Sequence, residues 1–424
     1  RFNFNGRFTG NSWADFLLGL PNWSRRLDPL LPREQEAVEV GLYLMDTFKV
    51  TPKLTLDYGL RWDYFGSDTI KDGLQSNWDP GSGNVIIPPG KMSEVSPIYP
   101  PTITLAEGEV VPTPSKSNFR PRIGLAYRTE SDFVIRGGYG IFTERLGYFS
   151  RVISTGPFEI EQTYTNEINN GQPLFSFPNP WPDLSAAAIP SQSVTGYPMS
   201  TKNGLIHQFN LSVEKEFWDI GFRVSYVGSR SRNLNYTLNR NKPEPSDIPF
   251  TTDRRPLPEY VNTTYWENNG SSNYNSFQFE AKKRVGMFTF NGHYTLASNV
   301  HNYLITENPY NVTSRWSYDN FQQRNRAVIT AQLDLPVGRG RRYMADAPSV
   351  VDAIAGGWKF TWISYFANGP HFSPSYSGAD PSNTNTFGGL PDRICDGNLP
   401  GGSRGPNGWF DPSCFAVPPE GRFG

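Results

Sequence analysis

The sequence contains no long apolar run, and no stretch approaches the ~18 consecutive apolar residues that a membrane-spanning helix needs. We therefore exclude a helical membrane protein. An excess of charge of one sign is also missing, because 39 basic and 40 acidic side chains leave a formal net charge of -1. Nucleic-acid binders need a clustered basic surface for their phosphate contacts, so no nucleic-acid partner is expected.

Metal ligands and catalytic motifs are scarce. Only four histidines and two cysteines occur in 424 residues, and neither H-E-x-x-H nor C-x-x-C spacing is present. Gly401-Gly-Ser-Arg-Gly405 matches G-x-S-x-G, but a Gly/Pro-rich loop lacks the strand and helix that this motif requires. Asp392, Asp396 and Asn398 could offer oxygen ligands to calcium, although their spacing differs from an EF-hand loop and favours a solvated loop. We predict no enzyme, no cofactor and no metal.

The two cysteines, Cys395 and Cys414, enclose a loop that contains Pro400 and Trp409. Such sparse use of cysteine fits an exported bacterial protein. Exposed loops of exported proteins seldom keep free thiols, so we predict a disulfide rather than two thiols. Loop-closure entropy gives this bond a stabilising effect of roughly 3 kcal/mol.

Aromatic residues and glycine are abundant and favour strands and turns: 11 Trp, 21 Tyr, 29 Phe and 40 Gly. The clearest segment is residues 54–64, where Leu, Tyr and Trp alternate with Thr, Asp, Gly and Arg. On a strand these two sets lie on opposite faces, whereas on a helix the apolar set would scatter around the axis. The segment is therefore predicted to be a strand.

The same alternation recurs along the chain and predicts about ten strands. An eleventh strand is predicted at Phe2–Phe8, and short helices at Ser12–Leu20 and Ser349–Ala355. The ten strands lie near residues 37–50, 53–65, 119–129, 132–144, 205–217, 220–234, 273–284, 287–298, 325–337 and 356–370.

The connections alternate between short and long. Tight turns are predicted at 50–53, 129–132, 218–221 and 284–287, and long Pro-, Asn- and Gly-rich loops at about 66–118, 144–204, 235–272 and 298–323. Structureless loops of this length count against an ordinary soluble domain. Short periplasmic turns and long extracellular loops are typical of an antiparallel transmembrane β-barrel. We predict an all-β chain in the outer membrane of a Gram-negative bacterium, with a soluble carbohydrate-binding β-protein as an alternative.

Several strings resemble one family. Lys49-Val-Thr-Pro-Lys-Leu-Thr-Leu-Asp-Tyr-Gly-Leu-Arg61 resembles a hairpin of TonB-dependent receptor barrels. The order of further strings is similar to the Oar-like subgroup, whose members usually carry a carboxypeptidase-regulatory-like domain. These strings begin at Asn118, Ile135, Gln208, Tyr226, Tyr274, Leu335 and Trp409. One departure is Gln322-Gln-Arg-Asn-Arg326, where the family often has an Asp-Arg-Arg-His-Arg-like run.

The resemblance implies that residues 1–424 are part of one barrel domain, about ten strands of a larger barrel. A plug domain, the regulatory-like domain and the last strands are then expected outside this chain. It further implies uptake of an unidentified large extracellular substrate, with outer-membrane lipid and the TonB energy-transducing complex as partners. Adhesion or matrix secretion through the loops is the alternative function.

Charged side chains on the polar face of the strands form the first set of candidate residues. A charge that faces lipid costs about 2–4 kcal/mol near the midplane, so these residues should face the lumen. There they either pair with one another or contact the plug. The set is Asp57, Arg61, Asp63, Arg122, Arg136, Glu214, Arg223, Glu280, Arg326 and Asp334.

Aromatic residues of the long loops form the second set. Aromatic rings beside Asn and Gly suit the binding of sugars or peptides, but large loops also need aromatic residues in order to pack against each other. Packing is the favoured interpretation. The ligand-binding candidates are Trp78, Trp181, Tyr260, Trp266, Trp316 and Trp409.

Overall fold

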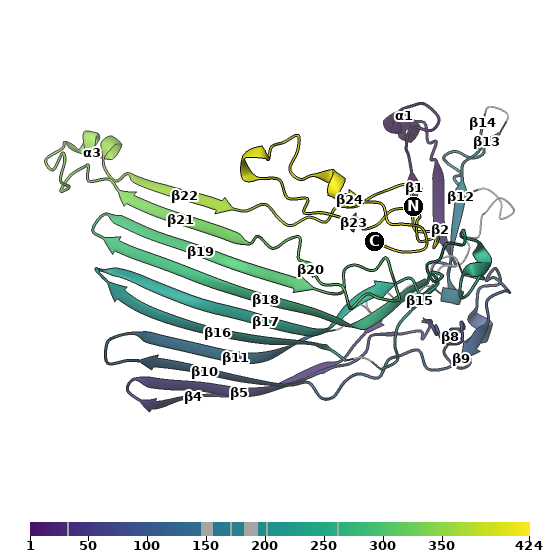
Figure 1. Ribbon diagram of the computed structural model, residues 1–424, viewed down its shortest axis with the longest axis horizontal. Helices are drawn as coiled ribbons and strands as arrows, with labels where there is room; N and C mark the ends of the chain where they lie inside the picture. Colours follow the sequence, from purple (N-terminus) through teal and green to yellow (C-terminus); the bar gives the residue numbers. More distant parts are fainter. Residues whose placement is uncertain (32–33, 146–155, 170–171, 182–193, 201, 261–262) are drawn as a thin grey trace.

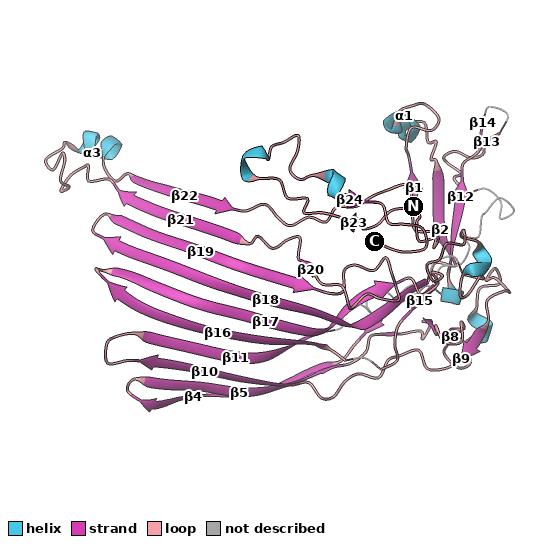
Figure 2. Cartoon of the chain, in the orientation of Figure 1, coloured by secondary structure: helices cyan, strands magenta, loops and turns pink. Residues whose placement is uncertain are grey.

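The structure is a computed structural model that describes residues 1–31, 34–145, 156–169, 172–181, 194–200, 202–260 and 263–424. It is dominated by one large antiparallel sheet, which confirms the all-β prediction and the ten predicted strands (Figures 1 and 2). These strands are β4 (Glu39–Thr51), β5 (Leu54–Phe65), β10 (Phe119–Arg128), β11 (Val134–Glu144), β16 (Gly204–Phe217), β17 (Ile220–Leu238), β18 (Thr263–Val285), β19 (Phe288–His301), β21 (Asn325–Asp334) and β22 (Lys359–Ala367).

Each of these strands pairs with the next one along the chain, from β4 at one edge to β22 at the other. In the described part of the chain the sheet stays open, because no ladder joins β4 to β22. Directly paired residues share a face of a sheet, and the register brings the polar sets of neighbouring strands together. For example, Asp57 lies opposite Gly124, and Glu214 lies opposite Arg223.

The other face of the sheet is apolar and uncovered. Leu60, Ile123, Leu211 and Phe277 keep between 45% and 58% of their side-chain surface exposed. Water would penalise so large an apolar surface, whereas lipid would not.

The two ends of the sheet differ, as the sequence predicts. Tight turns close the hairpins at the end on the left of Figure 1, and the long connections lie at the other end. Trp218 and Asp219 form a two-residue turn with φ of 52° and 58°, between the paired residues Phe217 and Ile220. The turn-side connection between β21 and β22 carries α3 (Ser349–Ala355), a helix predicted at these residues.

Two sequence predictions require correction. A spanning strand at Phe2–Phe8 is wrong: β1 covers only Phe2–Asn3 and pairs with β2 (Trp23–Asp28) in a separate three-stranded sheet. The chain turns at Gly6, whose φ is 85°, and continues into α1 (Ser12–Leu17), the other predicted helix.

The loop predicted at 235–272 is too long. Strand β17 continues to Leu238 and β18 begins at Thr263, so the ladder extends through pairs such as Tyr236 with Glu267. Both faces of this extension carry polar side chains, which hides the alternation that marks a strand in the sequence.

Short strands lie within the long connections. Among the described residues, no helix is both long enough and apolar enough to cross a membrane. The short strands are β3 (Gln35–Glu36), β6 (Thr69–Ile70), β7 (Asn77–Trp78), β8 (Val85–Ile87), β9 (Leu105–Glu107), β12 (Ile160–Thr165), β13 (Ile168–Asn169), β14 (Gln172–Pro173), β15 (Val194–Gly196), β20 (Ser317–Tyr318), β23 (Asp392–Arg393) and β24 (Phe415–Ala416).

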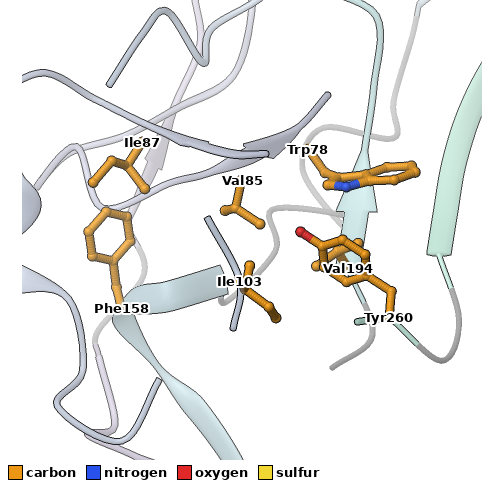
Figure 3. Packing of buried hydrophobic residues seen from close by; sticks show 7 residues of the cluster. All are labelled: Trp78, Val85, Ile87, Ile103, Phe158, Val194 and Tyr260. Atoms are coloured by element: carbon orange, nitrogen blue, oxygen red, sulfur yellow. The ribbon is translucent and has the colours of Figure 1, made fainter. Parts of the chain in front are cut away.

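Three long connections pack together at one end of the sheet, in a unit that we call the loop cap. Its buried core draws on the β5–β10, β11–β16 and β17–β18 connections (Figure 3). The core residues are Trp78, Val85, Ile87, Ile103, Phe158, Val194 and Tyr260. The loops therefore have a hydrophobic core of their own, which is joined to the large sheet where β15 pairs with β18.

Candidate functional site

A ladder of alternating charges crosses four neighbouring strands on the polar face. Arg136 on β11 and Arg223 on β17 both reach one oxygen of Glu214 on β16, at 3.3 and 3.1 Å. Arg223 also contacts Glu280 on β18 at 3.1 Å. The strand register makes this possible, since Glu214 lies opposite Arg223 and Arg223 lies opposite Glu280. We call Arg136, Glu214, Arg223 and Glu280 the ion ladder.

Four more residues of the predicted set find partners within the wall. Asp57 accepts a hydrogen bond of 2.7 Å from the hydroxyl of Thr47. Arg61 pairs with Asp63 at 2.8 Å, on its own strand. The remaining carboxylate, Asp334, lies 3.6 Å from the ammonium of Lys359 on β22.

The last two predicted lumen residues, Arg122 and Arg326, make no ion pair within the described part of the chain. The guanidinium of Arg122 lies 4.6 Å from the centre of the Phe142 ring, and its buried Nε has no hydrogen-bond partner. Arg326 lines a cleft of about 640 Å³ on the polar face, together with Arg223, Glu280 and His293. The ladder thus opens onto a polar cleft that carries excess positive charge.

Two of the loop aromatics are core residues of the loop cap. Trp78 and Tyr260 are 1% and 0% exposed, and their rings meet edge to face at 5.9 Å. The Tyr260 hydroxyl donates a 2.6 Å hydrogen bond to the carbonyl oxygen of Gly83. Burial raises the pKa of Tyr260 to about 12. Neither ring has a free face for a ligand, so Trp78 and Tyr260 serve to pack the loops against each other.

The other four loop aromatics differ in accessibility. Trp266 lies on β18 rather than in a loop. Trp181 packs against Phe2 and Tyr164 beside the small sheet of β1, β2 and β12. Only Trp316 and Trp409 are open to solvent, at 47% and 59% exposure, and of the six candidates these two could meet a ligand without rearrangement.

Asparagine side chains that the sequence analysis did not single out hold the loops together. Asn241, 1% exposed, donates to the carbonyl oxygens of Leu257 and Tyr260 at 2.8 and 2.7 Å and accepts from the backbone N–H of Leu257. Asn166 links Pro21 and Phe175 in the same way. These amides replace the backbone partners that irregular loops lack. The Asn-rich composition of the loops is the only signal of this role in the sequence.

Cys395 and Cys414 form a disulfide, with a Cα–Cα distance of 4.8 Å. The bond lies beside the pairing of β23 with β24. The possible calcium ligands nearby have other partners: Asp392 pairs with Arg422, and Asp396 with Arg393. Across the described residues no cluster of His, Cys, Asp or Glu side chains is placed to hold a metal.

The G-x-S-x-G string forms a short 3-10 turn at Gly401–Ser403. No strand leads directly into this turn, so the serine is not in a nucleophile elbow.

Comparison with curated proteins gives no match. Among solved structures the chain is similar to the FrpB iron transporter from Neisseria meningitidis (F3-3 variant), at 9% identity and a TM-score of 0.38, over 72% of this chain and 31% of that one. It is also similar to the siderophore receptor PiuA from Acinetobacter baumannii, at 12% identity and a TM-score of 0.36, over 74% of this chain and 32% of that one. The chain spans about a third of the length of these structures.

A sequence profile of the outer membrane beta barrel domain matches residues 1–424, the whole chain. The geometry agrees with this match: antiparallel strands joined by tight turns at one end, one apolar uncovered face and one charged face. The apolar face is suited to contact lipid, and the ion ladder lies on the opposite, polar face. The chain therefore belongs to the outer membrane beta barrel domain family, in the outer membrane of a Gram-negative bacterium.

Proposed function

We propose that this chain forms part of the wall and the extracellular cap of a TonB-dependent, Oar-like transporter that takes up a large substrate. A plug domain and the TonB energy-transducing complex belong to this proposal, as does the lumen role of the candidate residues. One observation carries it: the charged face combines a self-paired ladder with two arginines that lack an ionic partner.

The ladder stabilises the wall itself. Each carboxylate of the ladder touches at least one arginine from a neighbouring strand. Such pairs make the lumen wall hydrophilic and stabilise the pairing of neighbouring strands, and they need no other domain.

Arg122 and Arg326 differ from the ladder residues. A cation on a lumen wall without a carboxylate partner is suited to bind acidic groups from outside the wall. In the proposed transporter these groups belong to the plug, which closes the lumen until TonB acts on it. Two resemblances support the same assignment: the hairpin from Lys49 to Arg61 resembles TonB-dependent receptors, and the strings that begin at Asn118 and Ile135 are among those that resemble Oar-like receptors.

The test uses the full-length gene in its native host. We expect the protein in the membrane pellet, and uptake of a large extracellular substrate to depend on both this gene and the TonB gene. Adhesion or secretion of matrix that survives deletion of TonB would instead support the alternative function. A full-length protein found in the soluble fraction would contradict both.

Arg122 and Arg326, which lack an ionic partner within the described residues, allow a second and more specific test. In the R122Q/R326Q variant we expect the plug to be released more readily, measured as increased antibiotic entry through the barrel. Glu216 is a matched control, because it lies on the same face of β16 without an ion pair, and E216Q should leave entry unchanged.

A further inference from the structure

Two arginines of β17 lie on the lipid-facing side of the sheet. Arg230 and Arg232 share the face of Phe222, Val224 and Tyr226, since side chains two residues apart point the same way. Val224 and Tyr226 are exposed apolar residues of this face. A charge at mid-membrane depth would be costly here, so the height of the two arginines decides what they can do.

The height follows from strand geometry. Arg230 lies eight residues beyond Phe222, which is close to the tight turn at Trp218 and Asp219. At ~3.3 Å per residue and a tilt of 35–45°, this gives about 20 Å along the membrane normal. Arg232 lies about 5 Å higher. The apolar band of such barrels is ~25 Å tall, so both arginines lie at its extracellular edge.

Neighbouring strands change from apolar to polar at the same height. On β18 the outward residues are Phe279 and Phe277, followed by Asn275 and Asn273. On β16 the residue opposite Arg230 is His207. Leu205, opposite Arg232 on β16, is again apolar, so the change is complete on β17 and β18. There it marks the boundary between lipid tails and headgroups.

Both guanidiniums are held in place without being neutralised. Arg230 donates to the carbonyl oxygens of Ser229 and Tyr274 and to the Asn275 side chain, at 2.8–2.9 Å. Its guanidinium also lies 5.4 Å from the centre of the Phe209 ring. Arg232 donates to Ser231 at 2.7 Å and to the side chain of Asn273 at 3.1 Å.

These contacts use neutral acceptors, and no carboxylate pairs with either arginine in the described part of the chain. Nε of each arginine and Nη2 of Arg232 appear in none of these bonds and are free to donate. Two fixed guanidinium groups on adjacent outward positions match the oxygen geometry of a phosphate.

We propose that Arg230 and Arg232 form a binding site for a phosphate group of lipopolysaccharide in the outer leaflet. The charge complementarity and the continuity with the lipid-facing surface both favour this occupant. The site is independent of the proposed transport function, because it needs only the barrel in its membrane.

The experiment uses the full-length protein purified in detergent and titrated with bis-phosphorylated lipid A, with bound lipid counted by native mass spectrometry. We expect the wild type to retain lipid A, and R230Q/R232Q to bind it at least tenfold more weakly. Lys215 provides the matched control: it is a cation on the same face of β16, near the turn end. K215Q should bind like the wild type.

The conservative variant R230K/R232K keeps both charges but loses the planar fork, and we expect intermediate binding. Heat-modifiable migration on gels verifies that each variant is folded. Equal binding by the wild type and R230Q/R232Q would overturn the proposal, as would an equal loss in K215Q. A dimer that dissociates in R230Q/R232Q, without bound lipid A, would assign the surface to a second copy of the chain and also overturn it.

Discussion

At the residue scale, Glu214 is the carboxylate on which the ion ladder depends, because it bridges Arg136 and Arg223. In E214Q both arginines lose their shared anion. Partly exposed ion pairs contribute about 0.2–1 kcal/mol each, so we expect a loss of about 1 kcal/mol in unfolding free energy. Urea unfolding in lipid vesicles measures it.

The control is E216Q, on the same face and strand. A double-mutant cycle of E214Q with R223Q should give a coupling energy of about 0.5 kcal/mol. Additive effects of the two changes would mean that the pair contributes nothing to stability.

Asn241 is a second residue with a large expected effect. N241A leaves two carbonyl oxygens and one N–H of the loop cap without their partners, at about 1–3 kcal/mol for each group that stays buried. We expect proteases to cleave the 239–262 connection at least tenfold faster. The exposed Asn407 is the control, and N407A should be cleaved like the wild type. If N241A resists proteases as well as the wild type does, the hydrogen bonds of Asn241 do not stabilise this connection.

Side-chain faces could be predicted from the sequence, but side-chain partners could not. The two-residue period of a strand places Glu214 and Arg223 on the polar face whatever their neighbours are. Which arginine meets which carboxylate depends on the register between strands, and that is fixed by turn geometry and packing. The burial of Trp78 against Tyr260 could not be predicted from the sequence either, because this contact joins two connections that are far apart in the sequence.

At the scale of single elements, the Trp218–Asp219 turn fixes the β16–β17 hairpin with two residues at positive φ. A β-branched residue is strained in that conformation, whereas glycine is not. We expect D219V to lower the unfolding free energy by about 1–2 kcal/mol, and D219G to match or exceed the wild type. Vesicle unfolding in urea ranks the three proteins. If D219V is as stable as the wild type, the turn does not adopt this geometry.

Strands within the membrane could be predicted, because one face contacts lipid and the other contacts water. Strand β17 extends past residue 234, and β18 begins before residue 273. The two faces of these extensions do not differ in polarity, so the sequence pattern does not predict them. The strand predicted at Phe2–Phe8 is too long, because β1 covers only Phe2–Asn3. Alternation over a few residues cannot distinguish a short strand in a loop from a strand that spans the membrane.

At the scale of the whole molecule, the loop cap and the sheet should respond differently to alkali. Burial raises the pKa of Tyr260 to about 12, from an ordinary value near 10. Burial also raises the pKa of Tyr99 and Tyr197. The fold favours the neutral phenols, so their stabilising effect is complete below pH 10 and is lost as the pH rises toward 12.

We therefore expect the cap to become protease-sensitive between pH 10 and 12, while the circular dichroism of the sheet persists. Absorbance at 295 nm follows the tyrosinates. Y260F removes one late-ionising group and serves as the comparison. Loss of cap and sheet in one transition would contradict this separation.

The position of the cap core has a consequence for biogenesis. Its residues come from three connections that all lie on the far side of the bilayer from the tight turns. Each connection must cross the membrane before Trp78, Phe158 and Tyr260 can meet, so the cap cannot fold ahead of insertion. We expect the polar, Asn-rich connections to be translocated unfolded, and formation of the core to oppose their return. The folded cap would then make insertion of the hairpins hard to reverse.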